Sequence, residues 1–396
     1  MSPFHHKLKA ILDGQKMQLK ELKMLIPKEH FRIWIHAASL GEYEMAIPLI
    51  QEIYKKNPQT EFIISFFSPS GYKNAKLEPN CKKFYLPFDT KKNAENWMKS
   101  IQPDLIIFIK YEIWPIFLRT AHSQKIPVWF WNFTLRKNHF LLKSWAGFWL
   151  SSLIPCKGFY CVNQETVDIA NKIGLKNSKL LGDIRYLRTQ KIQSNLDSIP
   201  QKINDFTQNA SVLVLGSSWE NEEKALAHAL RIQKLQTNQK IIIAPHNINI
   251  ENINRIKELF AFAKTYSFSN FEGQKDAEIL IIDNIGLLSK LYSRANLSVV
   301  GGAFGKGLHN IIESAAAGAG VIFGPNIKKF PEAQQFLDAG IGFKAADENE
   351  MTQLILTLWL KQNSQDLQKL KEKTLAFFSN QIPQISEISD VIFVTN

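Results

Sequence analysis

Residues 299–325 read VVGGAFGKGLHNIIESAAAGAGVIFGP, and this stretch indicates the fold class of the second half of the chain. Two apolar runs enclose a glycine-rich turn and a short helical stretch, which is the pattern of a strand–turn–helix–strand unit in a parallel sheet. The glycines let the backbone approach a ligand closely, and we expect a helix opening near His309 and Asn310 to direct unpaired N–H groups at an anion. The stretch contains no GKS or GKT, so it is not a P-loop.

The same stretch has two open interpretations. In the functional one, Glu313 lies about one turn inside the helix, where a carboxylate can accept hydrogen bonds from a ribose diol. In the structural one, the glycines only make a tight connection between a strand and a helix. A glycine-rich turn alone does not separate the two, so other parts of the chain must.

Length and composition are those of a globular protein. The chain has 396 residues, of which 45% are hydrophobic and 21% are charged, and this length allows two domains with separate cores. The formal charge is +12, and residues 110–191 hold 13 Lys or Arg against four acids. Such a basic segment indicates an anionic partner: nucleic acid, an anionic membrane face, or a phosphorylated or carboxylated substrate.

Cysteine usage and hydropathy indicate the cellular setting. Cys81, Cys156 and Cys161 are too few for a disulfide framework and lack the further ligands of a zinc site, so we expect buried thiols in a reducing cytosol. No segment reaches the roughly 18 apolar residues of a membrane span, which predicts a soluble or peripheral protein. Residues 1–31 are basic, with apolar residues near helical spacing. This suits either a helix on a membrane surface or an amphipathic helix packed on its own domain.

Apolar strand-like runs alternate with helical stretches along the rest of the chain. This alternation predicts βαβ units and parallel sheets covered by helices on both faces. The polar segment 189–209 lacks strand-like runs, so we place a domain boundary there. We therefore predict an α/β protein with two tandem doubly wound, Rossmann-like domains, residues 32–195 and 205–396, after the basic segment 1–31. Such a tandem is the GT-B architecture, which glycosyltransferases share with non-hydrolysing sugar-nucleotide epimerases.

Glu42 lies in IWIHAASLGEYEM, residues 33–45, where a predicted strand ends and a helix begins. The helix dipole favours an ionised carboxylate there, and such a group is suited to take a proton from an attacking hydroxyl. The alternative is a first-turn glutamate that only complements the dipole. His36 lies inside the strand and is interpreted as a hydrogen-bonded core histidine.

Glu112 and Arg185 also follow predicted strands. Glu112 lies in KYEIWP, residues 110–115, where it can stabilise positive charge or orient an acceptor hydroxyl, or else form a salt bridge with Lys110 or a neighbouring basic residue. Arg185 lies near the domain boundary, where a guanidinium can neutralise a carboxylate or a phosphate.

Residues 129–153 mix aromatic side chains with Arg136, Lys137 and Lys143. Such a surface suits a lipid-linked anionic acceptor or a membrane interface. The alternative is an aromatic core helix with a solvated basic edge.

The second predicted domain offers candidate ligand contacts at two further strand ends. Ligands of doubly wound sheets bind at the carboxyl ends of strands, and backbone groups at the later position can contact a nucleobase. Neither position is specific by itself. The residues are Pro245, His246 and Asn247 at the first position, and Ile285, Gly286 and Leu287 at the second.

The order of these motifs resembles one known family. SLGE, KYEIWP, the basic aromatic segment, LGDIRY, GSSWENEE, APHN, GLHNIIESAAAGAGVIFGP and NIKKFPEAQQFL follow one another along the chain. Together they closely resemble the 3-deoxy-D-manno-octulosonic acid (Kdo) transferases of lipopolysaccharide assembly. The resemblance runs from about Arg32 to the C-terminal helices.

The resemblance implies an inverting, metal-independent glycosyltransferase without a cofactor, which transfers Kdo from CMP-Kdo to a lipid A precursor of the tetraacyldisaccharide 4'-phosphate type. It implies a peripheral protein on the cytoplasmic face of the bacterial inner membrane, with no nucleic acid partner. By motif, Glu42 matches the general base, and Glu112 and Arg185 match residues that stabilise the transition state. The implied CMP positions are Pro245, His246, Asn247, Ile285, Gly286, Leu287, Asn310, Ile311, Ile312 and Glu313, to which we add Gly302 and Lys306 of the glycine-rich turn.

Three departures from the family pattern matter. Many members have Arg where this chain has His246, which would make CMP binding more pH-sensitive. Lys110 replaces the first glutamate of the usual ETELWP motif. Many members also start with an apolar anchor, so we expect either that this chain begins late or that its basic and aromatic segments hold it to the membrane.

Two classes of alternative stay open. Within enzymes, the chain is another GT-B sugar-nucleotide transferase or a non-hydrolysing epimerase, which needs no lipid acceptor. Outside enzymes, it is a non-catalytic protein that binds anionic glycolipid or nucleic acid, for which a steep salt dependence of binding would be the first sign.

Overall fold

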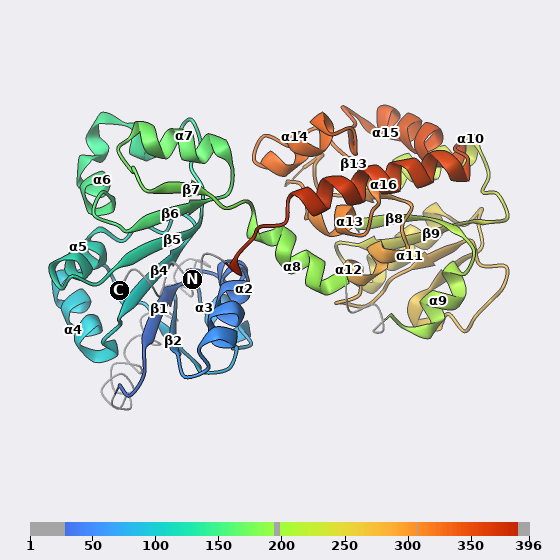
Figure 1. Cartoon of the computed structure of the whole chain (residues 1–396). Coiled ribbons are helices and arrows are strands. Elements are labelled where there is room, and N and C mark those ends of the chain that lie inside the picture. The colour runs from blue at the N-terminus through green and yellow to red at the C-terminus, as the bar shows by residue number, and fades with distance from the viewer. Residues whose placement is uncertain (1–27, 194–198, 306, 387–396) are drawn as a thin grey trace. The chain divides into compact units, whose positions relative to one another are not determined.

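The computed structural model of the chain describes residues 28–193, 199–305 and 307–386, in two compact units (Figure 1). The first unit comprises the chain up to Leu187 together with the segment that starts at Ile382, and the second unit comprises Arg188–Gln381. The predicted second domain ran to residue 396, whereas the tail groups with the first unit. In the described part of the tail, Ile385 packs against the core of the first unit, and Lys56 Nζ donates to the carbonyl of Ser386 at 2.7 Å.

The first unit contains a parallel sheet of seven strands within its described residues, in the order β3-β2-β1-β4-β5-β6-β7. Its elements are β1 (Arg32–His36), α2 (Leu40–Lys56), β2 (Glu61–Phe66), α3 (Pro69–Asn74), β3 (Cys81–Tyr85), α4 (Lys91–Ile101), β4 (Leu105–Ile109), α5 (Pro115–Ser123), β5 (Val128–Phe133), η1 (Phe140–Leu142), η2 (Ser144–Ala146), α6 (Gly147–Leu153), β6 (Gly158–Cys161), α7 (Gln164–Lys172), β7 (Ser178–Leu180) and the first turn of α8 (Ile184–Gln193), a helix that continues past Leu187 into the second unit.

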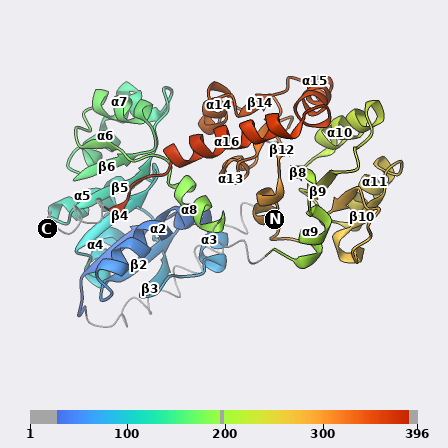
Figure 2. The same ribbon diagram turned by 45° about the vertical axis from the view of Figure 1, so that its right-hand side comes forward.

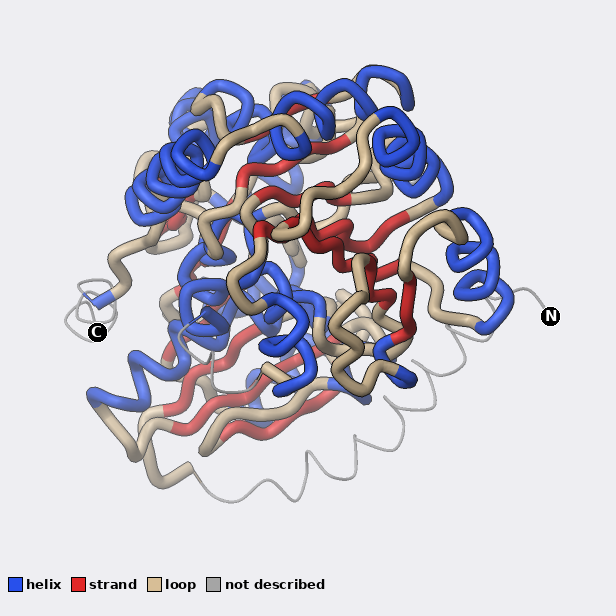
Figure 3. Tube along the Cα trace, turned by 90° about the vertical axis from the view of Figure 1, so that its right-hand side faces the viewer, coloured by secondary structure: helices blue, strands red, loops and turns tan. Residues whose placement is uncertain are grey.

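Helices cover both faces of this sheet, as the continuous apolar strands predict. Trp34 and Phe108 point to the face packed by α4, α5, α6 and α7, whereas Ile33 and Ile35 point to the face packed by α2, α3 and α8. Figure 3 shows strands running between helices in each unit. Because both faces of the sheet are buried, polar side chains that could contact a ligand are found at the strand ends, where the candidate site residues lie.

The second unit repeats this plan within its described residues, with the strand order β10-β11-β9-β8-β12-β13-β14. Its elements are α9 (Gln201–Thr207), β8 (Ser211–Ser218), α10 (Glu220–Ile232), β9 (Gln239–Pro245), α11 (Ile250–Leu259), β10 (Thr265–Ser267), η4 (Phe268–Asn270), β11 (Ile279–Ile281), α12 (Leu288–Leu291), η5 (Tyr292–Arg294), β12 (Leu297–Val300), α13 (Ile312–Ala316), β13 (Gly320–Phe323), α14 (Pro331–Asp338), β14 (Gly342–Lys344), α15 (Glu348–Ile355), the π-helical turn η6 (Leu356–Leu360) and α16 (Ser364–Asn380).

Helix packing in the second unit joins distant parts of the sequence. Leu226 of α10, Ile256 of α11 and Met351 of α15 belong to one buried cluster with the strands β8 and β9. The long helix α16 runs beside α13, as both Figure 1 and Figure 2 show. None of the helices in the described ranges is long and apolar enough to cross a membrane.

Two edge strands escaped the sequence-based prediction. They are β10 and β14, each of three residues at the border of a sheet. Such segments are too short to show strand periodicity. The longer strands of both sheets were predicted close to their observed positions.

Backbone conformation changes abruptly where the central strands end. Lys110 after β4, Asn132 in β5 and Ser217 in β8 have φ of +58°, +55° and +48°, in the left-handed region that side chains rarely adopt. Residues held this way cost about 1–3 kcal/mol each and cluster at functional sites. In β8 the distortion shifts the register against β9 between Gly216 and Ser218.

Gly216 gives a test of the packing at this strand end. A Cβ at Gly216 would lie 2.1 Å from Oη of the buried Tyr292, so Gly216→Ala should destabilise the protein by about 1–3 kcal/mol. Gly147→Ala is the control, because no atom lies within 4 Å of its added Cβ and its backbone is helical. Urea denaturation measures both, and equal midpoints would contradict the packing described.

Candidate active site

Glu42 is the third residue of α2 and closes a capping box at the start of the helix. Ser39 N–H donates to Glu42 Oε2 at 3.0 Å, and Glu42 N–H donates to Ser39 Oγ at 3.4 Å. The helix begins at Leu40, slightly earlier than predicted, so the structural alternative for Glu42 is present. Oε1 of Glu42 makes no hydrogen bond within the described residues, so this oxygen can accept a hydrogen bond from a ligand.

The electrostatic environment of Glu42 opposes the sequence-based expectation. Only 7% of the residue is exposed. Burial, and then the negative charge of Glu112, raise the pKa of Glu42 above its ordinary value, while Lys110, His36 and the Ser39 N–H oppose the rise. The net shift is therefore opposite to the one predicted from the helix dipole, because burial is the largest cause and favours the neutral form.

Glu112 lies beyond β4 and has the opposite shift. Burial would raise its pKa, but contacts with His36, the Trp114 indole and Lys110 lower it overall. Trp114 Nε1 donates to Glu112 Oε2 at 3.2 Å, and His36 Nε2 lies 3.7 Å from the same oxygen. The predicted alternative was a pair with Lys110 or a neighbouring basic residue, and the ring nitrogens nearest to this oxygen belong to Trp114 and His36.

Asp89 fixes the position of the helix that follows Glu112. Its carboxylate accepts the N–H groups of Ile116 and Phe117, at 3.1 and 3.0 Å, in the first turn of α5. Trp114 has no side-chain capping bond of its own, so an acid 27 residues earlier in the chain caps this helix. Sequence patterns within α5 gave no signal of this cap.

Arg185 is held by a neighbouring acid. Its guanidinium donates to Asp183 through Nε at 2.8 Å and through Nη2 at 2.5 Å, at the start of α8. A bidentate pair of this kind fixes the plane of the guanidinium. A substrate anion would therefore have to compete with the Asp183 carboxylate for the Arg185 guanidinium.

An aromatic surface extends from the residue next to Glu112. Tyr111 packs edge-on against His139, which contacts Phe140, and Phe140 stacks on Trp145 with ring centroids 6.0 Å apart. Trp145 is 62% exposed and Phe148 is 46% exposed. The alternative of an aromatic core helix holds only in part, since Leu141, Ala146 and Leu153 are buried beneath.

In the second unit, three rings from three strand ends stack together. Trp219 lies parallel to His246, with centroids 4.4 Å apart, and His246 lies 4.8 Å from His309. Trp219 Nε1 donates to His309 Nε2 at 3.5 Å. Burial, and then the proximity of His246, lower the pKa of His309 below its ordinary value. His246, which replaces the arginine of many family members, is exposed at the centre of the stack.

A buried glutamate ties the glycine-rich turn to α10. Glu222 accepts the N–H of Trp219 at 3.1 Å and the N–H of Gly302 at 3.0 Å, and it is fully buried. Its neighbour Glu223, also fully buried, accepts from Ser218 Oγ at 2.7 Å and pairs with Arg255. These acids connect loops that are some 80 residues apart, and the sequence showed them only as an acidic first turn.

The glycine-rich turn differs from its predicted form. The helix α13 begins at Ile312 and has five residues, so Glu313 lies in its first turn rather than about one turn inside. Much of the turn's backbone is already paired, since the N–H groups of Gly305 and Gly307 donate to Gly302 and that of His309 donates to Gly301. The expected array of unpaired N–H groups is therefore smaller than predicted.

Asn310 provides the cap of this short helix. Its Oδ1 accepts the N–H of Ile312 at 3.1 Å, and its Nδ2 donates to Glu313 Oε1 at 2.8 Å. Glu313 is thereby oriented in the first turn of α13. Lys306 lies outside the described residues.

The remaining predicted residues lie along the same edge of the second sheet. Pro245 ends β9, whereas His246 and Asn247 follow it, and Ile285, Gly286 and Leu287 precede α12 after β11. The strands β11, β9, β8 and β12 are neighbours in that order, so these loops are adjacent at one edge. Ile285 is 88% exposed, and Asn247 accepts hydrogen bonds from Asn249 and Asn252 within its own loop.

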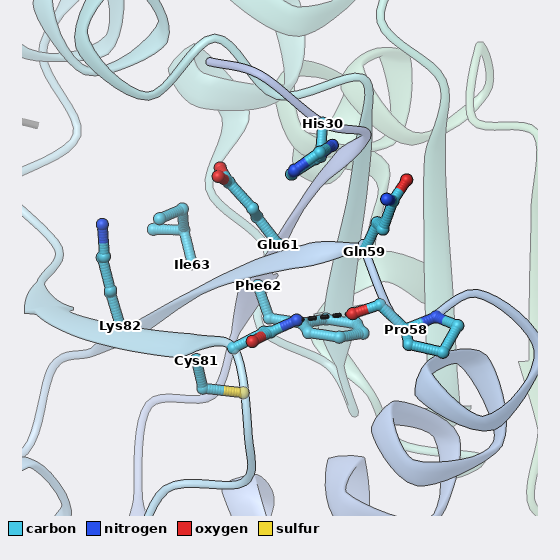
Figure 4. Close-up of a pocket in the computed structure, with 9 residues that line it drawn as sticks. His30, Pro58, Gln59, Glu61, Phe62, Ile63, Cys81 and Lys82 are labelled. Carbon is cyan, nitrogen blue, oxygen red and sulfur yellow. Dashed lines mark hydrogen bonds between the residues drawn. The ribbon is translucent and has the colours of Figure 1, made fainter. Parts of the chain in front are cut away.

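Cavities elsewhere in the units lie at the opposite edges of the sheets. Figure 4 shows one of about 370 Å³ at the amino ends of β2 and β3, lined by residues that include His30, Glu61, Cys81 and Lys82. Another, of about 410 Å³, lies beside Phe262 and Glu278. Within the described ranges, no three His, Cys, Asp or Glu side chains gather in a group that could hold a metal ion.

Comparison with known proteins agrees with the motif order. A family model described as 3-deoxy-D-manno-octulosonic-acid transferase (kdotransferase) matches residues 11–188. A 3-deoxy-D-manno-octulosonic acid transferase of Aquifex aeolicus is 26% identical, covering 90% of this chain and 96% of its own.

Two solved structures share the fold. A putative UDP-N-acetylglucosamine 2-epimerase of Listeria monocytogenes aligns with a TM-score of 0.62 at 9% identity, over 92% of this chain and 95% of that one. MurG of Acinetobacter baumannii aligns with a TM-score of 0.58 at 16% identity, over 92% of this chain and 99% of that one. At such identities the likeness supports the two-domain GT-B fold alone.

The family model and the curated relatives agree with each other and with the motifs that surround Glu42 and Glu112. The chain is similar to Kdo transferases over about 90% of its length, and it is a glycosyltransferase of GT-B fold.

Proposed function

We propose that this protein transfers Kdo from CMP-Kdo to a lipid A precursor, with inversion at the anomeric carbon and without a metal ion, in lipopolysaccharide synthesis. The observation that carries the proposal is the pair of carboxylates at one sheet edge, buried Glu42 and partly exposed Glu112, whose environments shift their pKa values in opposite directions. Such a pair is a common sign of divided acid and base roles.

Glu42 is the proposed general base. Its raised pKa makes it a stronger base than an ordinary glutamate, and Oε1 is available to a sugar hydroxyl. As Glu42 removes the hydroxyl proton, the acceptor oxygen bonds to the anomeric carbon of Kdo, and the bond from that carbon to the CMP phosphate breaks with its electron pair. Glu112, which stays ionised, stabilises positive charge that develops on the sugar.

The second unit is the proposed donor site. The exposed His246 and the neighbouring His309 lie where the cytidine or phosphate of CMP would be bound, together with Asn310 and Glu313. Arg185 of the first unit would stabilise the leaving phosphate once it exchanges part of its pairing with Asp183.

The aromatic surface of the first unit is the proposed contact with lipid. It combines exposed rings with Lys143 and Arg136, which suits the acyl chains and phosphates of an anionic glycolipid. We propose that the protein is peripheral to the cytoplasmic face of the inner membrane through this surface.

Glu42→Gln should abolish most of the transfer activity. Loss of a general base lowers kcat by roughly 10²- to 10⁴-fold. With CMP-Kdo and a lipid A precursor, products counted by mass spectrometry measure the rate. In the wild type, kcat should fall as the pH drops through a pKa above the ordinary 4.5, because Glu42 must be ionised and its pKa is raised.

Glu44→Gln is the matched control for Glu42, since the two lie on the same turn of α2 and Glu44 belongs to no proposed step. Its activity should stay within about twofold of the wild type. A Glu42→Gln enzyme that transfers Kdo at the Glu44→Gln rate would remove Glu42 as the base. Chelators should leave the wild-type rate unchanged.

Glu222→Gln should weaken donor binding. The amide places a donor against the N–H of Trp219 or Gly302, so the glycine-rich turn loses an anchor and the Kd for CMP should rise about 10-fold. Isothermal titration calorimetry measures the Kd. Glu220→Gln, in the same helical turn but exposed, should bind CMP as the wild type does. Equal Kd values for both variants would contradict the role of Glu222.

Phe148→Ala should weaken binding to vesicles that contain phosphatidylglycerol. If Phe148 inserts into the bilayer, loss of its ring should lower the coefficient for partition of the protein onto vesicles about 10-fold. Phe262→Ala is the control, because Phe262 is 49% exposed against 46% for Phe148, and both rings pack against an arginine. Co-sedimentation measures both, and equal losses would argue against a membrane surface at α6.

A further inference from the structure

His36 is fully buried at the end of β1, and the proposed mechanism assigns no role to its imidazole ring. Nδ1 lies 2.8 Å from Oγ of Ser65, which is directly opposite on β2. Nε2 has no hydrogen-bond partner within the part of the chain described, and it lies 3.7 Å from Glu112 Oε2. Buried polar atoms without a hydrogen-bond partner are rare, so the position of Nε2 beside the Glu112 carboxylate indicates a function.

The bonds of Ser65 determine which ring nitrogen of His36 carries the proton. Trp34 Nε1 donates to Ser65 Oγ at 2.8 Å, so the hydroxyl is an acceptor on that side. Its own hydrogen then has His36 Nδ1 as acceptor, the other contact of this hydroxyl in the described structure. A neutral imidazole that accepts at Nδ1 carries its proton on Nε2. The resulting N–H faces Glu112.

We infer that His36 is a positioning residue for Glu112: a buried relay from Trp34 through Ser65 holds the imidazole as an Nε2–H donor that orients the Glu112 carboxylate. The inference rests on the proposed function of Glu112. The 3.7 Å separation is just beyond the roughly 2.7–3.2 Å range of N–H···O bonds. A small rotation of the partly exposed Glu112 side chain closes it.

Two ring N–H groups would then converge on one oxygen of Glu112. Trp114 Nε1 already donates to Oε2, and its ring packs edge-on against His36 with centroids 5.3 Å apart. Oε1 makes no hydrogen bond within the described residues, so it is the oxygen presented to the substrate. The relay therefore sets both the direction and the charge of the carboxylate.

The direction of the pH effect follows from the groups that face this pair. Lys110 and Glu42 are the other charged groups involved, and burial favours the neutral form of both carboxyls. A hydrogen bond from His36 lowers the pKa of Glu112. Without this donor the pKa of Glu112 rises, so its ionised form is lost at a higher pH.

The test compares His36→Asn with His36→Gln in the full chain, by transfer assays across pH. The Asn amide lies near Nδ1 and keeps a partner for Ser65 but offers no donor to Glu112, whereas the Gln amide reaches the Nε2 position. We expect His36→Asn to lower kcat about 10-fold and to move the acidic limb of the profile to higher pH, with KM for the donor unchanged. His36→Gln should recover most of this loss.

Glu112→Gln in the same assay separates failure of the inference from failure of the proposed function. If Glu112→Gln is inactive while His36→Asn has the wild-type pH profile, the role of His36 is overturned and the role of Glu112 stands. If Glu112→Gln retains wild-type activity, both are overturned. If the two His36 variants lose activity and thermal stability equally without a shift of the acidic limb, His36 is only a core residue.

The tautomer gives an independent measurement. Nitrogen-15 NMR of the imidazole should show a protonated Nε2 and a bare, hydrogen-bonded Nδ1 in the wild type. The signal should change in Ser65→Ala, which removes the donor to Nδ1. The opposite tautomer in the wild type would overturn the relay.

Discussion

Burial of two carboxylates at the end of one parallel sheet is the constraint on which the rest of this site depends. Two like charges in a poorly solvated place cannot both be stabilised equally. Here the N–H groups that could stabilise them are unevenly shared, since Glu112 faces two ring nitrogens while Glu42 faces one backbone N–H. Different backbone features position the residues around the two carboxylates. Lys110 has a left-handed backbone, and Asp89 caps α5 after Glu112.

A glutamate in the third position of a helix occurs in both units with different consequences. Glu42 closes a capping box and still has an oxygen without a partner in the described structure. Glu222 occupies the same position of α10, but both of its oxygens accept backbone N–H groups, one of them from the glycine-rich turn. The local motif is therefore the same, and the neighbours across the sheet decide whether the carboxylate is available.

Much of the architecture could be predicted from the sequence, because strands buried on both faces leave continuous apolar runs and helices leave amphipathic ones. Three-residue edge strands such as β10 and β14 could not, since they carry no periodicity. For the site, the positions of Glu42 and Glu112 beyond strand ends were predictable. Their pKa shifts were not, because burial and the approach of His36 depend on packing between β1 and β4.

Several contacts that the sequence missed join residues that lie far apart along the chain. Ser65 lies opposite His36 only once the register of β1 and β2 is known. Trp219, His246 and His309 come from three strand ends, and no spacing along the chain marks them as a stack. The glycine-rich turn was found because its signal is local, but its internal pairing was not, since the same composition serves an open or a closed turn.

The most direct measurement of the central claim is a carbon-13 NMR titration of the Glu42 and Glu112 carboxyl groups in the full chain, assigned with the two Gln variants. The two environments predict separate titrations, with Glu42 above the ordinary value of 4.5 and Glu112 below it. Titration of both groups together near 4.5, or in the reverse order, would contradict the division of labour between them.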